Sequence, residues 1–393
     1  MKPFVITLLL VPLSLSGCGK GTSNSQQPGR VASAPASGPA SEQFAHPVDS
    51  PAAAIETRYL KGSIGSALGL QMKLAREGDK LTGSYFYQKV GTKIDLRGSV
   101  DKDSNIVLEE FDSNGKQTGV FKGLWAIDAE DGMVNIAGNW SKPDGQKKTA
   151  FSLHEQPIRF SGGTEIIAKT IKETNKKLKY EIEAEYPQLI GLLSPGFEKF
   201  NQEVKRVVLR EIAKFRKDMI PEVGVEEPPE QSSVPGSTLD MAYTVALATD
   251  DLISIEIDVG TYYHGAAHPN SNSEVLNFDL RNGKALKLAD LFKAGAKYLQ
   301  ALSTYSIKDL KKQSSSKVAD GMLDDQSIAS GAGPSAKNFQ SWTITKKGLG
   351  IRFDSYQVAP YAAGPQYVLI PYPVLKEIVD TNGALGPLMK LQL

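Results

Sequence analysis

Short stretches with strand-like alternation, separated by turn sequences, fill residues 55–156. Leu70, Met72 and Leu74 alternate with polar neighbours, which is the period of a strand with one buried face. Turn sequences such as EGDKLTG, DKDSN and KPDGQ recur along this stretch, as expected for an antiparallel meander. About seven or eight strands without a convincing helix predict a small barrel or a curled sheet.

Glycines and aromatic residues lie inside these predicted strands. The glycines are Gly62, Gly83, Gly98, Gly123 and Gly138. Because they have no side chain, they permit the bends of a tightly curved sheet. The aromatic residues are Tyr85, Phe86, Tyr87, Trp125 and Trp140. The favoured interpretation is that they fill the barrel interior, and the alternative is that they line a ligand pocket.

Residues 164–393 mix one strong helix pattern with strand hairpins. Ser194 and Pro195 supply a helix cap and a first-turn proline, and an amphipathic pattern follows them. Ile253, Ile255 and Ile257 alternate with polar residues, which predicts a half-buried strand. Further antiparallel hairpins are expected, and a second main helix is expected from Leu291 to about Lys312, capped by Asp290. The fold class is therefore α+β, with a barrel-like β domain first.

An acidic, proline-rich segment at 221–237 interrupts this second region and cannot form regular structure. It divides the α+β domain into a first part, 164–220, and a last part, 238–393. The sequence thus predicts two folded domains, 55–156 and 164–393, behind an N-terminal leader.

The leader has the features of an export signal. Lys2 precedes an apolar stretch of about a dozen residues, which is shorter than the roughly 20 residues that span a bilayer as a helix. Residues 1–17 are therefore expected to be a cleaved signal peptide. The sequence Leu15-Ser16-Gly17-Cys18 resembles the bacterial lipobox, which implies that the sulfur of Cys18 carries lipid. An ordinary signal peptide with an unmodified cysteine is the alternative.

Residues 18–54 are rich in Ser, Ala, Pro and Gly and are expected to form a disordered tether behind a membrane anchor on Cys18. Palmitate-type acyl chains would then supply membrane attachment. Cys18 is the chain's single cysteine, so no disulfide within the chain is possible. Cleavage would remove Lys2 and leave 44 basic and 44 acidic residues, a balance that argues against a nucleic-acid partner.

Three stretches of the second domain carry a family resemblance. They are TYYHGAAHPNSNSEVLNFDLRNGKALKLADLF, WTITKKGLGIRFDSYQVAPYAAGPQYVLIPY and the upstream YPQL. Together they resemble an extracytoplasmic α+β region of unknown function. That region occurs in the lysozyme-sensing anti-sigma-V factor and beside the catalytic domain of some peptidoglycan deacetylases. The resemblance covers about residues 170–375.

This resemblance implies a module that recognises cell-wall material or a wall-degrading enzyme. The sequence shows no deacetylase domain after the region and no transmembrane segment, so neither deacetylation nor sigma-factor control is carried over. The expected location is the extracytoplasmic side of the cell envelope. For an organism with two membranes, Gly19 after the lipidated cysteine favours the outer membrane.

His264 and His268 lie in the turn of the first resembling stretch. Their four-residue spacing suits a metal site on a helix, but Gly265 and Pro269 disfavour a helix there, and a third ligand is not evident in the sequence. The other interpretations are a histidine that bonds to backbone and holds the loop, and a loop that contacts a ligand. The family pattern implies that His268 is the usual histidine and that His264 is not.

Four tyrosines near these histidines, Tyr262, Tyr263, Tyr356 and Tyr361, could bind sugar rings or a protein partner. A Gly-x-Ser-x-Gly nucleophile motif is not present, and no cofactor is expected. The favoured function is noncatalytic binding of peptidoglycan or a lysozyme-type enzyme. The alternatives are a metal-dependent envelope hydrolase that uses His264 and His268, and a structural envelope scaffold.

Overall fold

The computed structural model describes residues 55–66, 68–87, 93–161, 163–191, 194–220, 236–314 and 323–390. The predicted signal peptide, Cys18, the tether and residues 221–235 of the proline-rich segment lie outside these ranges. Among the described residues, no helix combines the length and the apolarity needed to cross a membrane.

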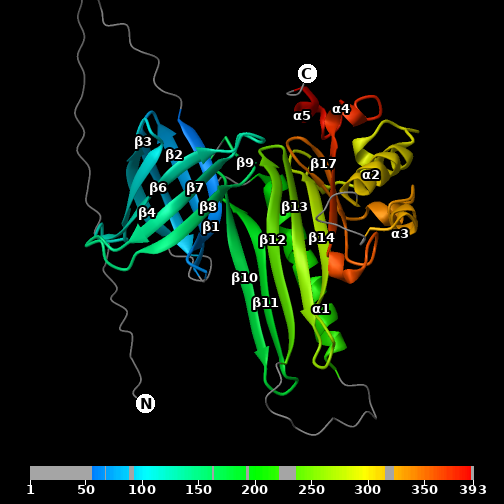
Figure 1. Ribbon diagram of the computed structural model, residues 1–393, viewed down its shortest axis with the longest axis horizontal. Helices are drawn as coiled ribbons and strands as arrows, with labels where there is room; N and C mark the ends of the chain where they lie inside the picture. The colour runs from blue at the N-terminus through cyan, green and yellow to red at the C-terminus, as the bar shows by residue number, and fades with distance from the viewer. Residues whose placement is uncertain are drawn as a thin grey trace, which may run out of the picture. The chain divides into compact units, whose positions relative to one another are not determined.

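The first eight strands close into an antiparallel barrel (Figure 1). They are β1 (Glu56–Ile64), β2 (Leu68–Glu77), β3 (Lys80–Tyr87), β4 (Lys93–Val100), β5 (Asn105–Phe111), β6 (Gln117–Ile127), β7 (Val134–Ser141) and β8 (Thr149–Glu155). The barrel predicted from the alternation and the turns is confirmed. The β1–β8 pairing, for example Gly62 against Leu153, closes the sheet, so the barrel has no open strand edge.

Glycines allow the barrel to curve, as predicted. Gly123 of β6 pairs with Gly138 of β7. A Cβ atom on Gly138 would lie 2.1 Å from the carbonyl oxygen of Lys122, so a larger residue would push the strands apart. The aromatic prediction holds for Tyr85 and Trp125, which are buried in the barrel core.

A seven-stranded sheet follows the barrel. Its strands are β9 (Ile158–Arg159), β10 (Glu165–Asn175), β11 (Tyr180–Ile190), β12 (Ser237–Thr249), β13 (Leu252–Tyr262), β14 (Asn270–Asp279) and β15 (Lys284–Ala285). Most neighbours pair antiparallel, as the predicted hairpins require. However, β12 pairs in parallel with β11 over one part of its length and with β9 over another.

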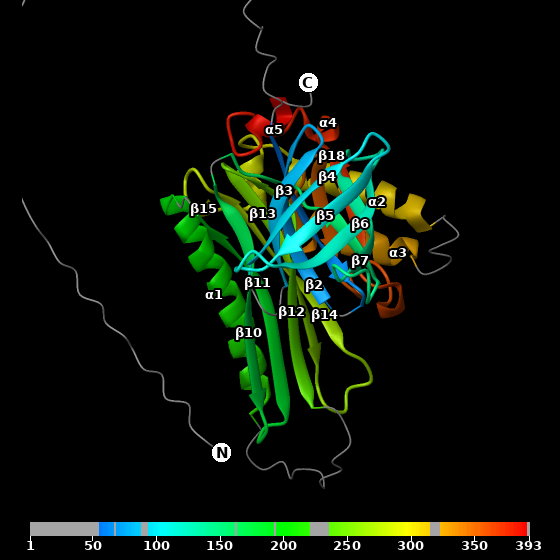
Figure 2. The same cartoon turned by 90° about the vertical axis from the view of Figure 1, so that its left-hand side faces the viewer.

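The predicted first helix is α1 (Pro195–Asp218), which lies along one face of this sheet (Figure 2). The Ser194 side chain accepts a hydrogen bond from the Phe197 N–H and caps the helix. Phe200, Val204 and Val208 pack with the alternating isoleucines of β13 in one core. The other face of the sheet presents the polar residues of the same alternation.

Among the described residues after β15, a smaller sheet and four α-helices follow. The sheet has β16 (Trp342–Ile344), β17 (Gly348–Phe353) and β18 (Gln366–Pro371), and the helices are α2 (Tyr298–Ser314), α3 (Asp325–Gly331), α4 (Tyr372–Leu375) and α5 (Gly386–Lys390). Side chains of the large sheet bond to the backbone of β16. Ser254 accepts from the Ile344 N–H at 2.9 Å, and Asn277 donates to the Trp342 carbonyl at 2.8 Å. These bonds satisfy backbone groups that a buried strand edge would otherwise leave unpaired.

The predicted start of the second main helix is wrong. Leu288–Leu291 form a short 3₁₀ helix, and α2 begins only at Tyr298. Phe292 instead forms a β-bridge with Val379, and Gly295 has a φ of 77°. Because that backbone conformation breaks a right-handed helix, the helix cannot start where Asp290 suggested.

Candidate functional site

The TYYHGAAHPNSN stretch forms the turn between β13 and β14, as its glycine and proline predicted. Thr261 pairs with Asn270 and closes the loop. Gly265 has a φ of 84°, a conformation that a residue with a side chain rarely adopts. The Ala266 N–H donates to the Tyr263 carbonyl at 2.9 Å and tightens the turn. Both histidines of this turn are exposed.

His268 stacks on Tyr361, which comes from the second resembling stretch. Their ring centroids lie 4.0 Å apart, at an interplanar angle of 25°. His268 Nδ1 lies 2.9 Å from the Pro269 carbonyl oxygen, and the Tyr361 hydroxyl donates to the same oxygen at 2.6 Å. Since a carbonyl only accepts, Nδ1 must donate this bond. Nε2 has no hydrogen-bond partner among the described residues.

Tyr356 completes an aromatic cluster with these two rings. Its ring centroid lies 5.6 Å from that of Tyr361, and its side chain is 64% exposed. Its backbone φ is 71°, which is costly for a bulky residue. Such strain persists only where surrounding contacts enforce it. We call His268, Tyr356 and Tyr361 the aromatic cluster.

Asp354 anchors the turn that carries Tyr356. It accepts a hydrogen bond from the Ser273 hydroxyl on β14 at 3.2 Å. Its Oδ1 also lies 2.9 Å from Arg352 Nε, as an ion pair whose angle does not make a hydrogen bond. Asp354 follows β17 of the small sheet and bonds to β14, the strand that comes after the His268 loop. The turn that carries Tyr356 is therefore attached to the same strand as the loop that carries His268.

The other three predicted site residues do not join the cluster. The Tyr263 ring lies 5.8 Å from that of Phe215, and its hydroxyl donates to Asp218 at the end of α1 at 2.9 Å. Burial, helped by the Asp218 carboxylate, raises the pKa of Tyr263 to about 12. Tyr262 pairs with Thr238 inside the sheet, and the His264 N–H donates to the Ser237 hydroxyl at 2.9 Å.

A buried arginine beside the cluster was not predicted from the sequence. The Arg352 side chain is 3% exposed, and its Nη1 binds both Glu256 and Asp258 of β13. Burial raises the pKa of Glu256 above its ordinary value, and the bond from Arg352 opposes that rise. The sequence showed that Glu256 and Asp258 lie on the polar face of the β13 alternation. It did not show that Arg352 is their partner.

Acidic side chains continue along the sheet face opposite α1. The pairing register places Glu183 beside Asp240, and Ala242 beside Asp258. Glu181, Glu183 and Asp240 are exposed. This acidic face therefore extends from β11 to β13. In the described part of the chain, no group of three or more His, Cys, Asp or Glu residues is arranged to hold a metal ion.

Comparison with known proteins finds a curated relative and solved structures that are similar to part of this chain. A curated relative is the peptidoglycan-N-acetylmuramic acid deacetylase PdaC of Bacillus subtilis (strain 168), 26% identical over 182 residues. The match covers 46% of this chain and 36% of PdaC, so it spans about a third of that enzyme's length.

Two crystal structures of DUF3298 family proteins are similar to this chain at 20% identity each. The protein from Bacteroides fragilis NCTC 9343 has a TM-score of 0.37, and the match covers 58% of this chain and 98% of that protein. The protein from Pseudomonas aeruginosa PAO1 has a TM-score of 0.40, with 56% of this chain and 95% of that protein covered.

A family model matches residues 289–373, which include α2, the small sheet and both tyrosines of the aromatic cluster. Its description is protein of unknown function, DUF3298. The resemblance predicted from the motifs of the second domain is thereby confirmed. Residues 289–373 of this chain thus match the DUF3298 model, and about a third of a peptidoglycan deacetylase is similar to this chain.

Proposed function

We propose that this chain is a noncatalytic binding protein of the bacterial cell envelope, anchored by lipid on Cys18, whose aromatic cluster binds the glycan of peptidoglycan. The observation that carries the proposal is the exposed, pre-arranged set of rings formed by His268, Tyr356 and Tyr361. Ring faces pack against the apolar faces of sugar rings, and the hydroxyls and imidazole bond to sugar hydroxyls.

The cluster is organised before any ligand arrives. Tyr361 is fixed by its hydrogen bond to the Pro269 carbonyl and by its stacking on His268. Pro360 precedes the 3₁₀ turn Tyr361–Ala363 and restricts its approach. A rigid binding loop loses little conformational entropy on binding. The relative PdaC supports the ligand class, because its name gives peptidoglycan N-acetylmuramic acid as that enzyme's substrate.

Replacement of the cluster rings should release the chain from the wall. In a sedimentation assay with purified sacculi, Tyr361→Ala is expected to weaken binding about tenfold, a typical loss for an aromatic residue at the centre of an interface. Tyr356→Gly should weaken binding similarly while leaving the free energy of unfolding unchanged or higher, because glycine relieves the strained φ of 71°.

Tyr367 supplies the matched control. It is 56% exposed, close to the 64% of Tyr356, but lies on β18 outside the aromatic cluster. Tyr367→Ala should therefore retain wild-type binding to sacculi. Equal retention of wild type, Tyr356→Gly and Tyr361→Ala would exclude the cluster as the binding site.

A lysozyme-type enzyme is the second candidate ligand, and the acidic face favours it. An enzyme that acts on an anionic wall gains from positive charge, and an acidic surface attracts such a partner. Retention on immobilised lysozyme that falls steeply between 50 and 300 mM salt, together with no retention on sacculi, would select this candidate. Stoichiometric zinc that is lost in His268→Ala would instead support the alternative of a metal-dependent hydrolase.

The membrane anchor is tested separately. When the full-length chain is expressed in a bacterium fed labelled palmitate, the wild type should incorporate label and fractionate with membranes. Cys18→Ala removes the chain's single thiol and should abolish both. Label incorporated equally by the variant would show that Cys18 is not the lipidated residue.

A further inference from the structure

A gap in the large sheet lies beside the barrel. β11 pairs with β12 only as far as Ala184 and Met241, and β9 joins β12 only at Ala248. Between these points one edge of β12 lacks a strand neighbour. Lys61 of β1 partly fills the gap, since its Nζ lies 3.2 Å from the Tyr243 carbonyl oxygen. Gln71 of β2 also reaches β12, where its side-chain N–H donates to the Tyr243 hydroxyl at 2.7 Å.

This arrangement leaves a cavity of about 220 Å³ between the barrel wall and the sheet. Its volume is below the roughly 300–1,000 Å³ of sites for drug-sized ligands. The walls are largely apolar, and the side chains that form them include Phe86, Ile158, Ile166, Ile167, Ile190 and Val245. Phe86 is thus an exception to the prediction that the barrel aromatics fill its interior. Sugar hydroxyls would lose hydrogen bonds against such walls.

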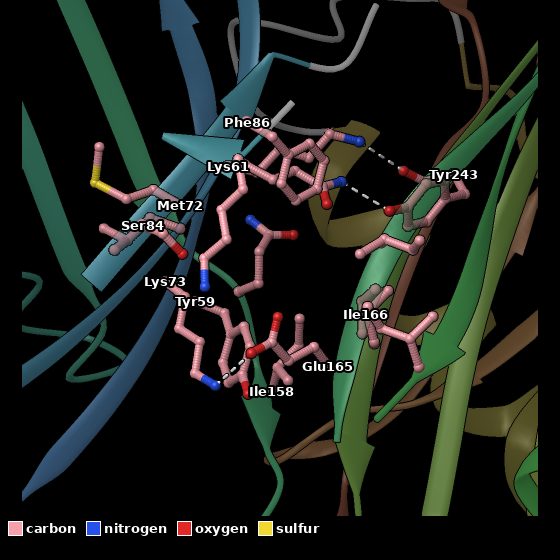
Figure 3. Close-up of a pocket in the computed structure, with 17 residues that line it drawn as sticks. Tyr59, Lys61, Met72, Lys73, Ser84, Phe86, Ile158, Glu165, Ile166 and Tyr243 are labelled. Carbon is pink, nitrogen blue, oxygen red and sulfur yellow. Dashed lines mark hydrogen bonds and ion pairs between the residues drawn. The ribbon is translucent and has the colours of Figure 1, made fainter. Parts of the chain in front are cut away.

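Lysine ammonium groups border the apolar walls. Lys73 pairs with Glu165 across the cavity at 2.7 Å (Figure 3), and Lys61 pairs with Glu185 at 3.4 Å. Lys93 also lines the cavity and has no ion-pair partner among the described residues. The cavity thus combines an apolar interior with one uncompensated positive charge.

We infer that this cavity binds a short aliphatic carboxylate, with its chain against the isoleucines and its carboxylate at Lys73 and Lys93. Burial of the chain provides affinity through the hydrophobic effect, and the ammonium groups fix the orientation through charge-assisted bonds. The site is separate from the aromatic cluster and does not depend on the wall-binding proposal.

Titration calorimetry of the full chain with sodium octanoate tests the inference. We expect one site with a Kd on the order of 0.1–1 mM, as suits a ligand of about ten heavy atoms. Octyltrimethylammonium has the same chain with the opposite charge and should bind at least tenfold more weakly. Equal binding of the two probes, or no binding of octanoate, would overturn the inference.

Two variants locate the binding. Lys93→Glu reverses the charge of an exposed residue, so the fold should persist, and it should weaken octanoate binding about tenfold. Ile167→Trp should fill the cavity and abolish binding, with folding checked by circular dichroism. Tyr361→Ala is the control and should bind octanoate like the wild type. Wild-type affinity in both folded cavity variants would place octanoate elsewhere and refute the site.

Discussion

Arg352→Met is expected to lower the free energy of unfolding by about 3–5 kcal/mol at pH 7, the typical cost of removing one partner from a buried ion pair. The Arg352 side chain is 3% exposed, and its guanidinium contacts three carboxylates, Glu256, Asp258 and Asp354. Without it, three negative charges face one another around an apolar methionine. Urea unfolding at pH 7 measures the loss.

The loss should shrink as the pH falls. Burial already raises the pKa of Glu256, and Arg352 opposes the rise, so the variant should raise it further. A carboxyl group whose pKa is higher in the folded state takes up protons on folding. Its unfavourable contribution therefore grows as pH rises through the folded-state pKa and disappears below the unfolded-state pKa. The difference between wild type and variant should narrow from pH 7 to pH 5.

A second substitution separates charge repulsion from lost packing. Glu256→Gln in the Arg352→Met background removes one unpaired carboxylate and should recover part of the stability at pH 7. Arg281→Met is the surface control. Arg281 is 43% exposed, with its nearest carboxylate oxygens 3.8 and 3.9 Å away, so about 0–1 kcal/mol should be lost. Equal losses in Arg281→Met and Arg352→Met would show that burial of the arginine does not matter.

The Arg352 variant should also weaken wall binding if the aromatic cluster is the site. Arg352 holds Asp354, and Asp354 bonds to Ser273 on β14. Tyr356 follows two residues later with a strained φ. Once Asp354 is released, that strain can relax and the ring can leave its position. Arg352→Met should therefore lower both the free energy of unfolding and the binding to sacculi. Tyr356→Gly should lower the binding alone.

Local patterns in the sequence were sufficient for most elements of the fold. The glycines of the barrel, the Ser194 cap of α1 and the Ile253–Ile257 alternation each depend on near neighbours, and each prediction was confirmed. The start of α2 could not be predicted, because the β-bridge between Phe292 and Val379 joins distant residues. Non-local pairing overrides local helix signals there.

The candidate sites depend still more on distant contacts. His268 and Tyr361 lie far apart in sequence. The histidine spacing marked the first loop, and only the family resemblance connected it with the second. Arg352 and Glu256 are 96 residues apart. Alternation predicts on which face of its strand each side chain lies, but it does not predict that the two are in contact. The cavity arises where β12 changes its partner from β11 to β9. The periodicity of the sequence carries no information about such a change of partner. The lysines that line the cavity could therefore not be predicted as a site.

Glu155 should be as important to the barrel as Arg352 is to the second domain. Its side chain is fully buried at the end of β8. One carboxylate oxygen accepts from Arg58 at 2.6 Å and from the Val134 N–H at 2.8 Å, and the other lies 2.6 Å from Arg159. Glu155 thus joins β1, β7, β8 and β9 at the point where the barrel meets the large sheet.

Glu155→Leu is expected to lower the free energy of unfolding by about 3 kcal/mol, because Arg58 and the Val134 N–H lose their buried partner. Arg58 is only 12% exposed and keeps Glu56 as its remaining partner. The double variant Arg58→Met with Glu155→Leu replaces the pair by apolar groups and should be more stable than Glu155→Leu alone. A double-mutant cycle in urea gives the coupling between the two residues. Strictly additive losses would mean that Glu155 acts through the Val134 N–H and Arg159 instead, and that the contact with Arg58 contributes nothing to barrel stability.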